Sequence, residues 1–212
     1  MSSRVAETLE ILFAPGKRFR LSPLVEATQL QVLFGCAPDP QNRAGSIQQI
    51  LSRSDVTNRI ERLAAQWEQF CRSGKPFSAA TTYDRGFLEV YLTYYATVNV
   101  PKLQAVLIEL VRQGKLSGTL RVLDIGVGPG TTALAVLDFL LVWEAVCRLW
   151  NESFPVTGVE LIGIDRNQAA LDYAAHVTRT FANQVDQWRR ARREAIAQRG
   201  AEALQAAQAT TA

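Results

Sequence analysis

The sequence predicts an α/β protein in which the first strands of a parallel sheet follow a helical N-terminal extension. Two apolar runs, residues 120–125 and 159–164, are typical of strands, and each precedes a segment with helical periodicity. A glycine-rich turn joins the first strand to its helix. Strands that alternate with helices form parallel sheets. The 212 residues suffice for one domain, or for one core with a helical extension.

The N-terminal part is predicted to be helical. Ser22-Pro23 is typical of a capped helix start, and Gly35 of a helix end. Residues 36–45 contain proline, asparagine and glycine, and are predicted to form a loop. Another helix is predicted after Ser54, because apolar residues recur there at spacings of four and three: Val56, Ile60, Leu63, Trp67 and Phe70.

Two further helices are predicted between residues 82 and 114. The first carries the aromatic residues Tyr91, Tyr94 and Tyr95, and Pro101 begins the second. The aromatic face could cover a cofactor pocket or present a substrate. Packing of the helix on the edge of the sheet is the alternative, and it is the more common use of such a face.

The segment that carries chemistry starts at Leu120 and has the sequence Leu-Arg-Val-Leu-Asp-Ile-Gly-Val-Gly-Pro-Gly-Thr-Thr. Its apolar residues suit a strand that is covered on both faces. Gly126, Gly128 and Gly130 allow a sharp turn and the close approach of a ligand. The helix that follows offers unpaired N–H groups at its start. The pattern predicts a nucleotide-type cofactor site.

The spacing of the glycines narrows the choice of ligand. A dinucleotide fingerprint G-x-G-x-x-G needs glycine where Thr131 stands, so a nucleotide-dependent oxidoreductase is disfavoured. A Walker A loop is excluded because no Gly-Lys-Ser/Thr follows. The remaining pattern is Asp-x-Gly-x-Gly-x-Gly, which begins at Asp124. With this motif the chain resembles the class I S-adenosylmethionine-dependent methyltransferases. An ordinary strand-to-helix turn without a cofactor is the alternative.

The resemblance implies a Rossmann-like methyltransferase fold that binds S-adenosylmethionine. Gly126, Gly128 and Gly130 would pass close to the amino-acid part and the ribose of the cofactor. Asp124 would help to fix the loop and would meet the ammonium group directly or through water. No residue is assigned as a catalytic base, and the methyl acceptor stays unknown.

The apolar segment from Leu134 to Trp150 is predicted to be the helix after the glycine loop. Asp138, Glu144 and Arg148 interrupt it, and it is shorter than the roughly 20 residues that a membrane span needs. We therefore expect this helix to be buried against the sheet, with no membrane insertion.

The second predicted strand ends at Asp165. The carboxyl ends of parallel strands border one crevice, so Asp124 and Asp165 are expected to face it together. The resemblance makes Asp165 the acceptor of hydrogen bonds from the ribose hydroxyls. A helix N-cap, shared with Asn167, is the alternative role. A long helix and the loop 151–158 account for a separation of the two acids that exceeds the usual roughly 20 residues.

A helical stripe continues after Asp165 as far as Trp188, and an Ala/Gln-rich tail, expected to be a frayed helix or disordered, ends the chain. The predicted organisation is a helical extension (1–80), a Rossmann-like cofactor-binding region (81–188) and an Arg/Ala-rich tail (189–212). Methyltransferases of this class have a seven-stranded sheet, so the fold is expected to be incomplete, with its first strands only. Truncation is the favoured explanation. Completion by another polypeptide and a degenerate relative are the alternatives.

The partners are less defined. A net charge of +3 does not by itself indicate nucleic acid, but Arg189, Arg190, Arg192 and Arg193 could contact RNA phosphates. A solvated helix face is the more common interpretation of such a cluster. The tyrosine-rich helix, the proline-initiated helix and the glycine motif also resemble methyltransferase-like proteins of the small ribosomal subunit. Those proteins carry a C-terminal cysteine cluster, and here no cysteine follows Cys147.

The remaining chemistry-bearing residues are few. Cys36, Cys71 and Cys147 form neither a metal-ligand pattern nor a disulfide framework, and His176 has no partner at ligand spacing, so no metal site is predicted. The N-terminus lacks the apolar core of a signal peptide, and a cytoplasmic location is expected. The predicted function is methyl transfer from S-adenosylmethionine. A non-catalytic module associated with RNA or the ribosome is the alternative.

Overall fold

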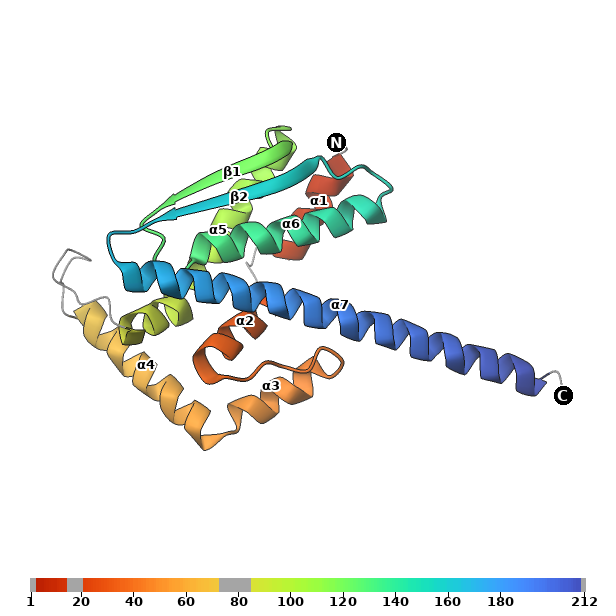
Figure 1. Ribbon diagram of the computed structural model, residues 1–212, viewed down its shortest axis with the longest axis horizontal. Coiled ribbons are helices and arrows are strands. Elements are labelled where there is room, and N and C mark those ends of the chain that lie inside the picture. The colour runs from red at the N-terminus through yellow and green to blue at the C-terminus, as the bar shows by residue number, and fades with distance from the viewer. Residues whose placement is uncertain (1–2, 15–20, 73–84, 211–212) are drawn as a thin grey trace.

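The computed structural model describes residues 3–14, 21–72 and 85–210 (Figure 1). The predicted α/β class is confirmed: the described residues are mostly helical and contain one parallel sheet. The predicted boundary between residues 80 and 81 lies outside them. In chain order the elements are α1 (Ser3–Phe13), α2 (Pro23–Phe34), α3 (Arg43–Leu51), α4 (Ser54–Arg72), α5 (Arg85–Arg112), β1 (Gly118–Ile125), α6 (Thr131–Leu149), β2 (Val156–Ile164) and α7 (Gln168–Thr210).

Strands β1 and β2 form the sheet, and α6 is the crossover between them. Leu120 is paired with Val159 and Asp124 with Gly163 in the parallel register. Both strands therefore end at the same edge, where the glycine loop and the start of α7 also lie (Figure 1). Residues far apart in the sequence meet at this edge.

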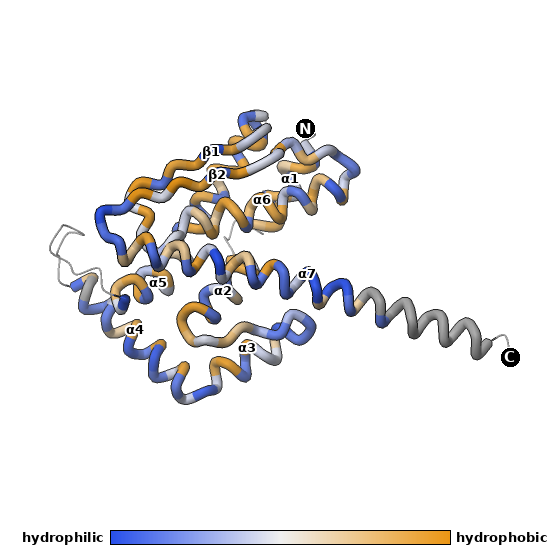
Figure 2. Tube along the Cα trace, viewed as in Figure 1, coloured by the Kyte–Doolittle hydropathy of each residue, from blue (hydrophilic) through white to orange (hydrophobic). Residues whose placement is uncertain are grey.

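Helices cover one face of the sheet. In the view of Figure 1, α5 and α6 lie beneath it. The opposite face carries four apolar side chains that are about half exposed or more: Leu123 (57%), Ile125 (78%), Ile162 (53%) and Ile164 (51%). Figure 2 shows both strands as largely apolar. The expectation of a strand covered on both faces is wrong, because no described element packs on this second face.

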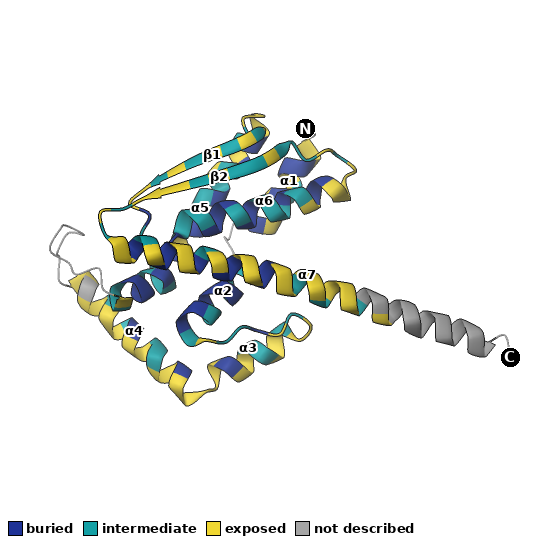
Figure 3. Ribbon diagram, in the orientation of Figure 1, coloured by how far each residue is buried: buried dark blue, intermediate teal, exposed yellow. Residues whose placement is uncertain are grey.

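The core extends from the sheet into the N-terminal helices. One cluster of buried residues joins α2, α5, α6 and α7, including Val32, Leu92, Leu134 and Phe181. A second joins α1, α5 and α6 around Trp143. Figure 3 shows buried residues along all of these helices, whereas α3 and α4 are largely exposed. Helices α1 and α2 thus share their core with the helices that support the sheet.

The two helices predicted between residues 82 and 114 are one helix, α5, which contains Pro101. A proline inside a helix removes one hydrogen bond and crowds the preceding turn. Here Ala96, Val100 and Ile108 are buried on both sides of the proline. The packing of this continuous buried face offsets the cost of the proline. Pro101 therefore does not begin a new helix, although the sequence predicts one.

One other segment also differs from expectation. The predicted loop 36–45 ends earlier, because the Asn42 side chain accepts a hydrogen bond from the Gly45 N–H and caps α3. The backbone of α7 continues as a single helix to Thr210 and extends away from the body (Figure 1). In the described part of the chain, no helix is both long enough and apolar enough to cross a membrane.

A buried carboxylate connects three helices. Asp138 of α6 is fully buried, and it accepts hydrogen bonds from Ser22 Oγ (2.5 Å) and Gln104 Nε2 (2.8 Å). Ser22 also caps α2, and Gln104 belongs to α5. Burial raises the pKa of Asp138 to about 6, although the two hydrogen bonds favour the charged form. This residue, which interrupts the apolar pattern of the sequence, holds α2 and α5 against α6.

Candidate functional site

The glycine loop has the backbone conformation that its sequence requires. Gly126, Gly128 and Gly130 have φ angles of 79°, 50° and 83°, all in the left-handed region. Residues with a Cβ rarely adopt this region. The loop is tied to the second strand, because Gly126 N–H donates to the Ile164 carbonyl at 2.7 Å. The predicted need for glycine in this turn is confirmed.

The three glycines have different surroundings. A Cβ on Gly126 would meet no heavy atom within 4 Å, and one on Gly128 only the Gly126 carbonyl oxygen at 3.9 Å. A Cβ on Gly130 would lie 3.2 Å from Ala174 Cα on α7. Gly126 and Gly128 therefore border open space that a ligand could enter. Gly130 serves instead to bring α6 and α7 close together.

Asp165 connects the loop to the start of α7. Its Oδ2 accepts a hydrogen bond from Gly128 N–H (3.1 Å), and its Oδ1 accepts one from Asn167 N–H (3.0 Å). Asn167 Oδ1 in turn accepts from Ala169 N–H at 2.9 Å. The first turn of α7 is thus stabilised by Asn167 rather than by Asp165 directly. Each oxygen of Asp165 keeps acceptor capacity for another donor.

Asp124 forms no hydrogen bond with this group in the described part of the chain. It is on the helix-facing side of β1 and lines a cavity of about 410 Å³ between the sheet, the start of α6 and α7. Among the described residues, none forms a hydrogen bond or ion pair with its carboxylate. Asp165, Gly126 and Gly128 do not line this cavity. The structure therefore joins Asp165 to Gly128 by a hydrogen bond, whereas Asp124 belongs to the lining of this cavity.

Arg179 is the other charged residue that lines this cavity. It follows Leu171 and Ala175 by two helical turns and one, so the helical periodicity of α7 places it on the same face. The sequence predicted Asp165 as a site residue but not Arg179. The helical periodicity of α7 was the signal that could have identified this arginine. A cavity with one carboxylate and one guanidinium suits a ligand that carries both charges.

The first turn of α6 has hydrogen-bond donors that a ligand could use. Gly130 is its N-cap residue and provides no side-chain hydrogen bond. Thr131 Oγ1 is buried without a partner in the described chain, and Thr132 and Ala133 line the cavity. The unpaired N–H groups of a first helical turn attract anionic groups. The donors that the glycine motif predicts are therefore present beside Asp124.

The aromatic residues of α5 have a packing role. Tyr94 is stacked on Trp67 of α4, with ring centroids 5.4 Å apart, and Tyr91 is stacked on Tyr95 at 4.5 Å. None of these side chains lines the cavity beside Asp124. The contacts favour helix packing over a lid or a substrate-binding role.

Two other titratable residues lie near the start of α7. His176 packs edge-on against Tyr173, whose buried hydroxyl has no partner in the described chain. Burial raises the pKa of Tyr173. Within the described ranges, no three His, Cys, Asp or Glu side chains are grouped as metal ligands.

Comparisons with protein-family models, with curated protein sequences and with solved structures find no match to this chain. The interpretation of the site therefore depends on its own geometry.

Proposed function

We propose that this chain is an S-adenosylmethionine-dependent methyltransferase whose cofactor region is built on the first two strands of a Rossmann-like fold. The observation that carries the proposal is the hydrogen bond from Gly128 N–H to Asp165 Oδ2. It joins the acid at the end of the second strand to the glycine loop at the end of the first. These are the two places where α/β proteins of this kind bind nucleotide-type ligands.

The residues present fit the cofactor. The open space at Gly126 and Gly128 allows close approach of the ribose, and Asp165 retains acceptor sites for its hydroxyl groups. Asp124 and Arg179 line one cavity and offer opposite charges to the ammonium and carboxylate of an amino-acid group. The first turn of α6 supports the same carboxylate. The cavity volume of about 410 Å³ lies in the usual range of about 300–1,000 Å³ for ligand sites.

When bound, S-adenosylmethionine supplies an electrophilic methyl group attached to a sulfonium. This chain contributes orientation: Asp165 would hold the ribose, and Asp124 and Arg179 would fix the amino-acid end. Fixing both ends of a flexible ligand limits the geometries that its reactive carbon can adopt, which favours in-line attack. The apolar wall of the cavity, including Val122 and Leu161, would keep water from that end of the ligand.

Calorimetric titration with S-adenosylmethionine tests the proposal. We expect saturable binding that is lost in Asp165→Ala, and no binding of NADH. Because Asp165 also holds the loop, a second variant is needed that leaves the fold unperturbed. Asp124→Asn suits this purpose, since its carboxylate has no partner among the described side chains and backbone groups.

The expected result is weaker binding in Asp124→Asn with an unchanged urea midpoint. Arg179→Gln should weaken S-adenosylmethionine more than adenosine, because only the former carries the carboxylate. Absence of binding to the folded wild-type chain would refute the proposal. Equal affinity in wild type and Asp124→Asn would refute the role of the cavity but not that of Asp165.

The four exposed arginines favour a second candidate, a non-catalytic module that binds RNA. No described carboxylate lies within salt-bridge distance of Arg189, Arg190, Arg192 or Arg193. Unpaired guanidinium groups on an exposed helix are available to phosphates. This candidate predicts salt-sensitive binding of single-stranded RNA that survives Asp165→Ala and weakens when all four arginines are replaced.

A further inference from the structure

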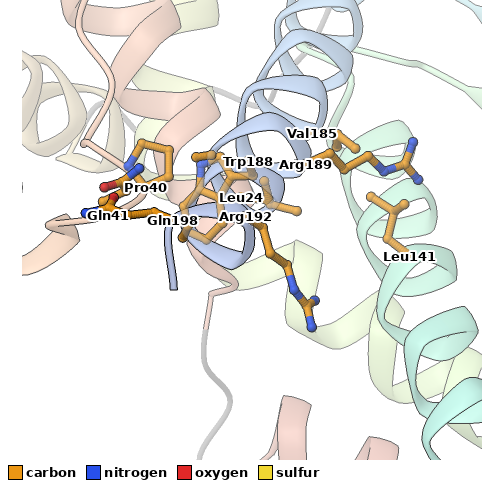
Figure 4. Close-up of a pocket in the computed structure, with 11 residues that line it drawn as sticks. Leu24, Pro40, Gln41, Leu141, Val185, Trp188, Arg189, Arg192 and Gln198 are labelled. Atoms are coloured by element: carbon orange, nitrogen blue, oxygen red, sulfur yellow. The ribbon is translucent and has the colours of Figure 1, made fainter. Parts of the chain in front are cut away.

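A larger cavity lies on the other side of α7, in the part of the molecule where α2, the segment before α3, and α6 approach this helix. Its volume is about 620 Å³ (Figure 4). It shares no lining residue with the cavity beside Asp124, and none belongs to the glycine loop. Any function of this cavity is therefore independent of the proposed methyltransferase site.

Part of the wall of this cavity is apolar. Leu24 of α2, Leu141 of α6, and Val185 and Trp188 of α7 form much of it. In Figure 4, Pro40, Gln41 and Gln198 lie on one side of Trp188, and Leu141 lies on the other. These residues come from four segments that the fold brings together, so the hollow exists only in the folded chain.

Two arginines provide the charge. Arg189 and Arg192 line the cavity and are one helical turn apart, so they extend from the same side of α7. In Figure 4, the side chain of Arg189 extends toward Leu141, and that of Arg192 extends from the helix in a different direction. No acidic residue lines the cavity, and neither guanidinium forms an ion pair with a carboxylate in the described part of the chain. The residues that line the cavity therefore carry a net positive charge.

Trp188 contributes its indole ring to the wall. Its indole Nε1 is buried and has no acceptor among the described residues, so this donor does not face the open hollow. The cavity thus combines an apolar surface with two cationic groups.

We infer that this cavity binds an organic anion with an apolar body, such as a medium-chain carboxylate. Its carboxylate is held by Arg189 and Arg192, because guanidinium groups form charge-assisted hydrogen bonds with carboxylates. Its hydrocarbon chain lies against Leu24, Leu141 and Trp188, where apolar burial is favourable. The cavity volume lies within the usual range of small-molecule sites.

The arrangement of the arginines favours a small anion over RNA. Arg190 and Arg193 do not line this cavity; they border a neighbouring hollow, which Arg189 also lines and which contains Asp186. A nucleic acid attracted by the net charge of the helix would depend on both pairs alike. A ligand in the cavity depends on Arg189 and Arg192 alone. The two pairs therefore provide a matched comparison on one helix, with equal loss of charge.

Calorimetric titration of the full chain with decanoate, below its micelle concentration, tests the inference. We expect one saturable site that is weakened at least tenfold in the double variant Arg189→Gln/Arg192→Gln. The control Arg190→Gln/Arg193→Gln should bind as the wild type does. Decyltrimethylammonium, which has the same chain and the opposite charge, should not bind at this site. All four arginines are exposed, so the variants are expected to keep the urea midpoint.

A second variant tests the cavity itself. Trp188→Phe keeps an aromatic ring but reduces the apolar area of the wall, so decanoate affinity should fall by a smaller factor of about two to ten. Equal weakening by both arginine pairs would overturn the inference in favour of diffuse electrostatic attraction. It would also be overturned by equal affinity for decyltrimethylammonium, or by the absence of saturable decanoate binding. Displacement of decanoate by oligouridine that depends on both pairs would favour RNA instead.

Discussion

The Gly128 N–H donates a hydrogen bond to Asp165 Oδ2 at 3.1 Å, although 37 positions separate the two residues. The second oxygen of the same carboxylate accepts from Asn167 N–H at 3.0 Å. One side chain thus positions both the glycine loop and the start of α7. A change at Asp165 therefore affects the local fold as well as any ligand that the loop binds.

Asp165→Asn is expected to destabilise the chain by about 1–2 kcal/mol, because an amide has one acceptor oxygen for two backbone donors. Urea unfolding measures this loss. Asp172→Asn is the matched control: Asp172 is exposed on the same helix and, among the described residues, accepts a hydrogen bond only from the exposed Gln168 side chain. It should change stability by less than about 0.5 kcal/mol. Equal effects of the two substitutions would contradict the bridging role of Asp165.

Gly130→Ala is expected to affect mainly stability, and Gly126→Ala mainly the affinity for S-adenosylmethionine. Both place a Cβ on left-handed backbone, at a cost of about 1–2 kcal/mol. At Gly130 the new Cβ also contacts Ala174 Cα at 3.2 Å, so α6 and α7 must shift and the loss of stability should be larger. At Gly126 the Cβ extends into open space, so the greater effect should be on S-adenosylmethionine affinity. Urea unfolding and calorimetry on both variants measure the two effects, and an identical pattern would contradict this assignment.

Asp138 is expected to make stability depend on pH. Its pKa of about 6 in the folded chain exceeds the value of about 3.9 expected for the unfolded chain, so folding takes up a proton between about pH 4 and 6. Its contribution to stability is therefore most favourable at the acidic end of this window and falls as the pH rises through 6. Between the two ends of this window, the contribution of Asp138 to the free energy of unfolding changes by about 3 kcal/mol.

Asp138→Asn should remove this dependence. The amide nitrogen that the substitution introduces could donate to Gln104 Oε1, which is buried without a partner in the described chain, if the Gln104 amide is reversed. We therefore expect the variant to fold at neutral pH and to be no less stable than the wild type at pH 7.5. Urea unfolding at pH 4.5, 6.0 and 7.5 gives the difference between the two chains. A difference that does not change with pH would show that Asp138 does not titrate in this range.

Ile125→Thr is expected to change the free energy of unfolding by less than about 0.5 kcal/mol, because Ile125 is 78% exposed on the open face of the sheet. Phe139→Ala, at a fully buried position in the core, should cost about 3–5 kcal/mol. Thermal and urea unfolding measure both values. A large loss in Ile125→Thr would indicate that the open face is covered in solution.

Local sequence patterns were sufficient to predict several elements of this fold. The two strands, the glycine turn between Ile125 and Thr131, and the helix that begins at Ser54 all depend on near neighbours in the chain. The left-handed backbone of Gly126, Gly128 and Gly130 also follows from residue type, because glycine has no Cβ to oppose it. The proximity of Asp165 to the glycine loop followed from a rule of parallel sheets.

Only the tertiary structure decided which of these residues act together. It made α5 continuous through Pro101 because the buried face on both sides of the proline outweighs a local break signal. It left one face of the sheet open, placed Asp124 with Arg179, and placed Trp188 with Arg189 and Arg192. Hydrophobic periodicity specifies which side of an element is buried but not which other element covers it. Partners distant in the sequence are therefore settled by packing, whereas turns, caps and strands are settled by the residues within them.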